Sequence, residues 1–279
     1  VKSYTLSIVE DPMNANLLFL GTDDGLYISL NAGNQWMKWT AGFPTVSTKD
    51  LVIQPREHDL VIGTFGRAAW VLDDIRPLRA MANGNVLTKT LQLFAPPTAY
   101  QAAYQQPTGS RFGGDALFNG ENKRSGAMIS YYINRPAAAK EEKKEKETAR
   151  KKKRKGTKKM EAPIVKKELA SEVKFDSIKL EIFEGARLIR TLHQKAPKEN
   201  GIHRMYWSMN EKGADRPSRK IRKRTYEPRG VSVKPGSYNL KMSFGNQTSE
   251  SSIKVEFDPR LEMSTEAITE IYNASKDME

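Results

Sequence analysis

The sequence predicts an all-β protein, and three observations support this prediction. Short apolar strands separated by Gly turns occur twice near the start of the chain, with Pro12 and Pro55 at corresponding places, 43 residues apart. Alternating apolar and polar residues between Gly and Pro turns return from residue 176 onward, as in half-buried strands. Residues 137–170, between these regions, form a low-complexity run of Ala, Glu, Lys and Arg, which predicts a charged insertion.

The repeat consists of three pairs of matching segments: Ser7–Pro12 with Leu51–Pro55, Leu17–Thr22 with Leu60–Thr64, and Gly25–Ile28 with the region Gly66–Val71. Four-stranded propeller blades repeat at about 40–50 residues, so the period favours blades over helical repeats. The alternative is two unrelated strand pairs, because apolar strands and Gly turns recur in any β domain.

We therefore predict the last two blades of a β-propeller. The strands of the first blade are expected at Tyr4–Val9, Leu17–Leu20, Leu26–Leu30 and Gln35–Thr40, and those of the second at Lys49–Ile53, Leu60–Thr64 and Ala68–Leu72, with Thr90–Phe94 as a suggested fourth. A ring closes with about 4–8 blades. We expect the remaining blades to come from residues N-terminal to Val1, in the same chain or in a cleaved partner that stays bound.

A polar turn follows the third predicted strand. Residues 29–36 follow the pattern SxDxGxxW, with the pattern's residues at Ser29, Gly33 and Trp36 and with Asn31 in the Asp position. This pattern resembles the Asp-box of BNR-type propellers. The segment Gly63–Asp74 also looks like the closing blade of exported, sortilin-like (VPS10-type) propeller proteins of bacteria, which are often labelled glycosyl-hydrolase-like. The resemblance implies that the Asp-box residues are mainly structural and that a sandwich domain follows the propeller.

The second half of the chain has the strand pattern of a small immunoglobulin-like β-sandwich. Strands are expected at Met128–Ile133, Asp176–Phe183, Leu188–Leu192, Gly201–Trp207, Ser237–Phe244 and Ser251–Phe257. Several of these segments resemble the FlgD-type immunoglobulin-like module that ends many exported bacterial proteins. Ser264 is expected to cap a short C-terminal helix over Thr265–Lys276.

These patterns predict four regions. Residues 1–98 form the propeller blades, 99–124 a linker, 125–258 the sandwich interrupted by the insertion 137–170, and 259–279 a C-terminal helical tail.

The net charge of +13 is concentrated in two segments, residues 140–167 and 216–229. The densest run is Lys151, Lys152, Lys153, Arg154 and Lys155. Such a run can bind a polyanion through salt-sensitive contacts. The insertion lacks the aromatic residues on which bases stack, however, so a solvated insertion is favoured and a nucleic-acid partner is not expected.

Two adjacent carboxylates, Asp23 and Asp24, resemble part of a glycosidase site, which needs two carboxyl groups across the scissile bond. Adjacent Asp residues in a turn more commonly accept backbone hydrogen bonds, and this interpretation is favoured. Trp39 is the Trp least explained by packing and the best candidate for binding carbohydrate. Together with Arg67, these residues form the candidate ligand-binding set.

Catalytic and metal-binding motifs are lacking. The three His residues have no metal-ligand spacing and the chain has no Cys, so neither a metal nor another cofactor is expected. No apolar run reaches 18 residues, so no membrane span is expected.

The favoured function is a non-catalytic binding or assembly segment of an exported protein, which is periplasmic, at the cell surface or secreted. It would present a propeller face to a protein or glycan ligand. The alternatives are part of a glycoside hydrolase whose catalytic groups lie mostly upstream, and a polyanion binder that acts through the Lys/Arg runs.

Overall fold

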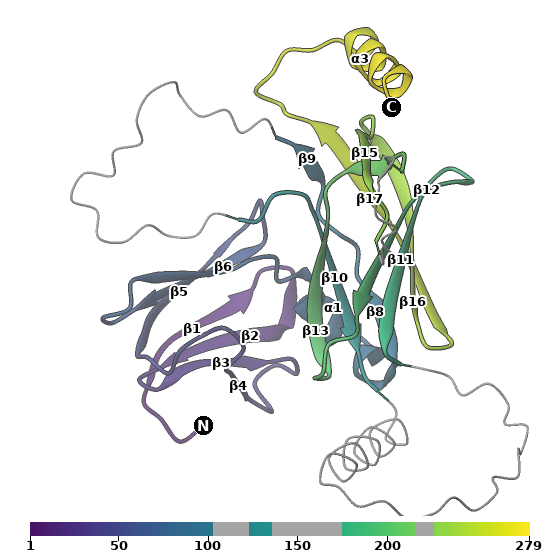
Figure 1. The fold of residues 1–279 in the computed structure, drawn as a ribbon. Helices are drawn as coiled ribbons and strands as arrows, with labels where there is room; N and C mark the ends of the chain where they lie inside the picture. Colours follow the sequence, from purple (N-terminus) through teal and green to yellow (C-terminus); the bar gives the residue numbers. More distant parts are fainter. Residues whose placement is uncertain (103–122, 136–174, 216–225) are drawn as a thin grey trace, which may run out of the picture. The chain divides into compact units, whose positions relative to one another are not determined.

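The structure, a computed structural model, describes residues 1–102, 123–135, 175–215 and 226–279 (Figure 1). These residues are mostly in β-strands, so the all-β prediction is confirmed. The chain divides into two compact units, Val1–Phe94 and Ala95–Glu279, and each is described by itself. The insertion 137–170, the basic run Lys151–Lys155 and most of the predicted linker lie outside the described residues.

The first unit begins with a four-stranded antiparallel sheet in the order β1-β2-β3-β4. Its strands are β1 (Thr5–Asp11), β2 (Asn14–Thr22), β3 (Gly25–Ser29) and β4 (Met37–Trp39), which lie at the four places that the sequence predicts. The turn between β2 and β3 contains the Asp-Asp-Gly step, where Gly25 has φ 138°. Positive φ explains why this position needs Gly.

A second sheet has the order β5-β6-β7 and contains β5 (Thr48–Gln54), β6 (Asp59–Thr64) and β7 (Ala69–Leu72). The suggested fourth strand is wrong for this sheet, because β8 (Leu91–Leu93) does not belong to it. Forty-three residues after β4, the chain is instead in helix α1 (Arg76–Ala82), followed by the 3₁₀ helix η1 (Asn85–Thr88). Pro77 in the first turn of α1 favours this helix start, since its fixed φ suits a helix and its missing N–H is not needed there.

The two sheets of the first unit have the same register, with corresponding residues 42 or 43 positions apart. In the first sheet Ser7 pairs with Gly21 and Val9 with Phe19; in the second, Asp50 pairs with Gly63 and Val52 with Val61. Both ladders carry an irregularity just before these pairs, between Thr5 and Ser7 and between Thr48 and Asp50. The repeat in the sequence is therefore a repeat of strand pairing.

Strand β5 of the second sheet lies beside β1 and β2 of the first. A Cβ added to Gly21 would lie only 2.7 Å from the backbone oxygen of Thr48, so the sheets approach closely at this glycine. Both sheets contribute buried side chains to the core of this unit: Leu17, Phe19, Leu26 and Ile28 from the first, and Leu51, Leu60 and Ile62 from the second.

The second unit contains a five-stranded sheet in the order β12-β11-β16-β17-β9, in which β9 runs parallel to β17 and the other neighbours are antiparallel. Its strands are β9 (Ala99–Gln101), β11 (Ser177–Glu184), β12 (Arg187–Lys195), β16 (Gly236–Phe244) and β17 (Gln247–Phe257). β10 (Ala127–Ile133) pairs with β13 (Gly201–Trp207), and β14 (Asn210–Lys212) pairs with β15 (Arg229–Ser232). The short strands β9, β14 and β15 were not predicted from the sequence.

The core of the second unit follows the predicted alternation along β11. Ile178, Leu180 and Ile182 are fully buried, because alternate side chains of a strand point to the same face. Trp207 is also fully buried; its ring meets that of Tyr238 edge-on, with centroids 5.5 Å apart. The indole Nε1 donates a hydrogen bond to the backbone oxygen of Asn210 at 2.9 Å, so its polar group is satisfied.

The C-terminal helix is α3 (Thr265–Asp277). Ser264 is its N-cap, and its hydroxyl accepts a hydrogen bond from the backbone N–H of Ala267 at 3.2 Å. This is the cap that the sequence predicts.

Candidate functional site

The turn from Ser29 to Trp36 is built around the side chains of Ser29 and Asn31. The Ser29 hydroxyl is fully buried and accepts hydrogen bonds from the backbone N–H groups of Gly33 at 2.9 Å and Asn31 at 3.3 Å. It donates to Asn31 Oδ1 at 3.1 Å, and Asn31 Oδ1 also accepts from the N–H of Gln35 at 2.8 Å. These two side chains thus bind three backbone N–H groups of the turn.

The backbone conformation of this turn requires a small residue after Ala32. Ala32 and Gly33 both have positive φ, 54° and 84°, and a Cβ at Gly33 would lie 3.6 Å from the Trp36 ring. Trp36 is half-buried and closes the turn. The four residues of the predicted Asp-box thus form one local structure on the edge of a sheet.

The two adjacent carboxylates hold the β2–β3 turn. Asp24 Oδ1 accepts hydrogen bonds from the hydroxyls of Thr22 at 3.0 Å and Tyr27 at 3.3 Å, and Asp24 Oδ2 forms an ion pair with Lys38 at 3.0 Å. The hydrogen bond from Lys38 is the main cause that lowers the pKa of Asp24. Asp23 Oδ1 accepts from the backbone N–H of Tyr4 at 3.2 Å. Asp24 is therefore a charged acceptor at neutral pH, which is unsuitable for a general acid.

Trp39 and Arg67 lie in different sheets. Trp39 is half-buried in β4 opposite Leu26, and Arg67 is exposed in the turn between β6 and β7. The backbone oxygen of Arg67 accepts a hydrogen bond from Trp70 Nε1 at 2.9 Å. Among the described residues, no hydrogen bond or ion pair joins Trp39 or Arg67 to Asp23 or Asp24, so the candidate ligand-binding residues do not form one polar site.

A buried charged cluster that the sequence did not reveal connects α1 to the β1 strand. Arg79 binds Asp11 through two parallel hydrogen bonds, and its Nη1 donates to His58 Nδ1 at 3.0 Å. Burial is the main cause that lowers the pKa of His58, and the charge of Arg79 lowers it further. A neutral His58 that accepts from Arg79 holds the guanidinium in place, so this cluster is structural.

Apolar side chains are exposed on the outer face of the second sheet. Val52, Val61 and Val71 lie opposite one another in a single row across β5, β6 and β7. Val52 is 54% exposed and Val71 is 55% exposed. The first sheet exposes Ile8, at 60%, on its own outer face. These faces are candidate interaction surfaces, because a row of exposed apolar side chains on a sheet face commonly marks a binding surface.

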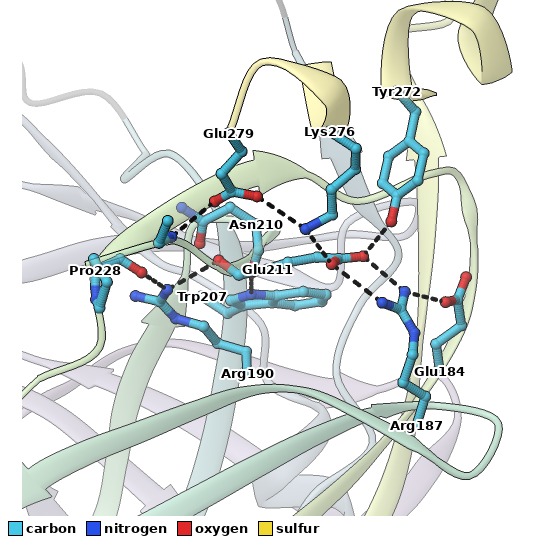
Figure 2. Close-up of polar contacts among 11 residues, drawn as sticks. Glu184, Arg187, Arg190, Trp207, Asn210, Glu211, Pro228, Tyr272, Lys276 and Glu279 are labelled. Atoms are coloured by element: carbon cyan, nitrogen blue, oxygen red, sulfur yellow. Dashed lines mark hydrogen bonds and ion pairs between the residues drawn. The ribbon is translucent and has the colours of Figure 1, made fainter. Parts of the chain in front are cut away.

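The second unit contains a polar network centred on the buried carboxylate of Glu211 in β14 (Figure 2). Arg187 donates to Glu211 Oε1 at 2.7 Å and to Oε2 at 3.2 Å. The Tyr272 hydroxyl donates to Oε1 at 2.6 Å, and Lys276 Nζ lies 3.1 Å from Oε2. Burial by itself raises the pKa of Glu211, but the hydrogen bonds from Arg187, Tyr272 and Lys276 together outweigh it and lower the pKa to about 2.

Nearby, the buried Arg190 binds backbone carbonyl groups. It donates to the backbone oxygens of Glu211 at 2.9 Å and of Glu227 at 3.0 Å, and also to that of Pro228. Arg190 therefore holds the backbone of β14 beside the segment that leads into β15.

Within the described residues, no group of three or more His, Asp or Glu side chains could hold a metal ion. Of the helices in the described part of the chain, none is long and apolar enough to cross a membrane.

Comparison with known proteins adds little to these findings. No protein-family profile matches the chain, and no curated protein matches it significantly. Among solved structures, the extracellular domain of a one-component system from B. thetaiotaomicron aligns with 93% of this chain at 13% sequence identity and a TM-score of 0.20. The chain spans 26% of the length of that structure. A likeness this weak carries no argument about fold or activity.

Proposed function

We propose that this chain is a non-catalytic assembly and binding segment of an exported, sortilin-like β-propeller protein, with an immunoglobulin-like domain after the propeller blades. In this proposal the two sheets of the first unit are the last two blades of a ring. Their outer faces pack against further blades, and the completed ring presents a face to a protein or glycan ligand.

One observation supports this proposal most strongly: corresponding residues of the two sheets are buried in one and exposed in the other. Phe19 and Ile28 of the first sheet are buried, whereas of their counterparts on the second sheet Val61 is half-buried and Val71 is 55% exposed. The surface of the second sheet thus repeats a surface that the first sheet buries.

The glycines at corresponding positions of the two sheets also support a third sheet beside the second. Gly21 is the point where the first sheet touches the backbone of Thr48. Its counterpart, Gly63, lies on the outer face, where the nearest atom to an added Cβ is Asp50 Cβ at 3.4 Å. A third sheet with the same repeat can therefore approach Gly63 as the second sheet approaches Gly21.

The outer face of the first sheet shows the reverse difference. Leu51 of the second sheet is buried, at 6% exposure, whereas its counterpart Ile8 in the first sheet is 60% exposed. Sheets that each use one face to contact the next sheet and the other face to contact the previous one add head to tail. Such an array closes into a ring when the rotation between neighbouring sheets allows it. This arrangement favours blades over a self-contained two-sheet domain.

The carboxylates give less support to the alternative of a glycoside hydrolase. Asp24 is engaged by Lys38, Thr22 and Tyr27, and its pKa is lowered rather than raised. A glycosidase acid needs a raised pKa. The polyanion alternative depends on Lys151–Lys155, which lie outside the described residues.

The decisive experiment is native mass spectrometry of the protein isolated from its source. We expect a mass several times the 31.5 kDa of this chain, or a tightly bound partner that supplies further blades. A mass of 31.5 kDa without a partner would overturn the proposal.

A matched pair of variants tests which surface is involved. The double variant V52K/V71K places charges on the outer face of the second sheet, so it should abolish association with the partner segment. T248K adds a charge at an exposed position of β17 in the second unit and should leave association unchanged. Equal association of both variants would show that this face is not the binding surface.

A further inference from the structure

Helix α3 is attached to the second unit in an unusual way. None of its residues is buried. Ile271 of the helix is 56% exposed, and Met278, directly after it, is 81% exposed. Helices that pack on a protein core normally bury an apolar stripe. Here apolar burial contributes little to holding the helix.

The side chains that hold α3 are polar and lie on one face. Tyr272 and Lys276, four residues apart, both bind the carboxylate of Glu211, as Figure 2 shows. Glu279, just after the helix, accepts a hydrogen bond from the backbone N–H of Ala214 at 3.2 Å and pairs with Lys276 at 2.9 Å. Lys234 Nζ lies 5.2 Å above the ring of Tyr272, which is a cation–π distance.

The residues before α3 provide a hinge. Asp258, the residue after β17, is buried and binds Arg260 through two side-chain contacts, at 2.5 and 2.8 Å. The next four residues, from Leu261 to Ser264, are all exposed. The connection between β17 and α3 is therefore not packed against the unit just before the helix begins.

The network remains satisfied when the helix leaves. Arg187 binds both oxygens of Glu211 from β12, and this contact does not involve α3. Removing one partner of a buried ion pair is costly because it leaves an uncompensated charge. Glu211 keeps Arg187 as its partner and gains access to water, so undocking of α3 avoids this cost.

We propose that α3 is a detachable clasp, which docks through the Glu211 network and leaves as one unit while the strands stay folded. Undocking uncovers the carboxylate of Glu211 and the backbone N–H of Ala214.

Hydrogen exchange measured by mass spectrometry on the full chain tests the clasp. In the wild type, α3 amides should exchange faster than those of β11 and β16, since they open without global unfolding. The variant E211Q changes no residue of α3. It should speed exchange in α3 by about tenfold, because the bonds from Tyr272 and Lys276 lose their charged acceptor, and affect β11 and β16 less, because Arg187 keeps Glu184 as an ion-pair partner.

The double variant Y272F/K276Q removes the contacts to Glu211 from the helix side, leaves the pair of Glu211 with Arg187 intact, and should also speed exchange in α3. K254Q is the control, because it removes a lysine from an exposed ion pair with Glu256 in β17 and should change nothing in α3. The proposal is overturned if α3 exchanges as slowly as β11 in the wild type, or if neither variant affects α3. It is also overturned if the variants speed exchange in α3, β11 and β16 equally.

Discussion

Arg79 and Asp11 form a buried, two-pronged ion pair although they are 68 residues apart in the chain. Arg79 Nε lies 2.7 Å from Asp11 Oδ2, and Arg79 Nη2 lies 2.5 Å from Oδ1. The Asp11 side chain is completely buried, at 0% exposure. The pair joins α1 to the end of β1, and Asn14 Nδ2 reinforces it by donating to the backbone oxygen of Arg79 at 3.1 Å. The helix that follows the second sheet is thereby fixed to the first.

This pair predicts a large effect of the substitution Asp11→Asn. Removing the charge leaves the Arg79 guanidinium buried without its counterion, which typically costs about 3–5 kcal/mol. We expect a loss of this size in the free energy of unfolding of the first unit, measured by urea denaturation. Lys38→Gln is the control, because it breaks the partly exposed pair with Asp24 and should cost about 1 kcal/mol or less. A D11N effect no larger than that of K38Q would show that the pair contributes little.

The two corresponding glycines predict opposite outcomes for the same substitution. Gly21→Ala places a methyl group 2.7 Å from the backbone oxygen of Thr48 and 2.8 Å from Thr48 Cγ2, so the sheets must separate. The expected cost is about 1–3 kcal/mol. Gly63→Ala meets only ordinary contacts, 3.4 Å or longer, and should change stability in this chain by about 0.5 kcal/mol or less.

The proposed ring predicts that Gly63→Ala reduces association with the partner segment even though it is nearly neutral in this chain. Thermal unfolding and association measured on the same two variants separate the effects. Equal stability of G21A and G63A would contradict the close approach of the sheets at Gly21.

The hydrogen bonds of Asn31 predict that Asp, the residue of the Asp-box pattern, is more stabilising at this position. Its Oδ1 accepts from the Ser29 hydroxyl and the Gln35 N–H. A carboxylate accepts such hydrogen bonds more strongly than an amide oxygen does. We expect Asn31→Asp to raise the free energy of unfolding by about 1 kcal/mol, and Asn31→Ala to lower it by about 1–2 kcal/mol. Chemical denaturation of both variants checks the prediction, which fails if N31A is as stable as the wild type.

The lowered pKa of Glu211 predicts that docking of α3 weakens at acid pH. Its pKa in the folded chain is lowered to about 2 from an ordinary value of 4.5. Arg187 stays bound to Glu211 when α3 leaves, so only the share of this lowering that comes from Tyr272 and Lys276 stabilises docking. That share is fully present above pH 4.5 and is lost as the pH falls toward about 2. Hydrogen exchange in α3, corrected for the intrinsic effect of pH, should accelerate across this range in the wild type.

The variant E211Q supplies the control for this pH dependence. Because Gln does not titrate, exchange in its α3 should be fast at all these pH values and nearly independent of pH. An acceleration of the same size in wild type and E211Q would assign the effect to other carboxylates.

Comparison of prediction and structure shows where sequence patterns are sufficient. The strands of the first sheet, the cap at Ser264 and the alternation along β11 were predicted because each depends on neighbouring residues: a turn, a side chain that binds a nearby N–H, or a period of two. The fourth strand of the second sheet was predicted wrongly. The repeat pattern does not show that Pro77 begins a helix where β4 has its counterpart.

The sites that the sequence missed depend on contacts between distant residues. Arg79 belongs to no motif of the sequence, and only the packing of α1 brings it to Asp11. Glu211 likewise lies between Trp207 and a Lys/Arg-rich segment, with no pattern that connects it to Tyr272. The candidate ligand-binding residues show the converse: the sequence grouped Trp39 with Arg67, but Trp39 lies in β4 of the first sheet and Arg67 in the turn between β6 and β7 of the second.

The sequence by itself determined the β-rich class, the 43-residue repeat and the local turns, because hydrophobic alternation and turn chemistry act over a few residues. Only the tertiary structure decided which face of each sheet is covered and which buried charges meet, because burial and ion pairing depend on elements that are far apart in the chain. The difference between buried Ile28 and exposed Val71, two residues at equivalent places in the repeat, is invisible in the sequence and is the basis of the proposed assembly.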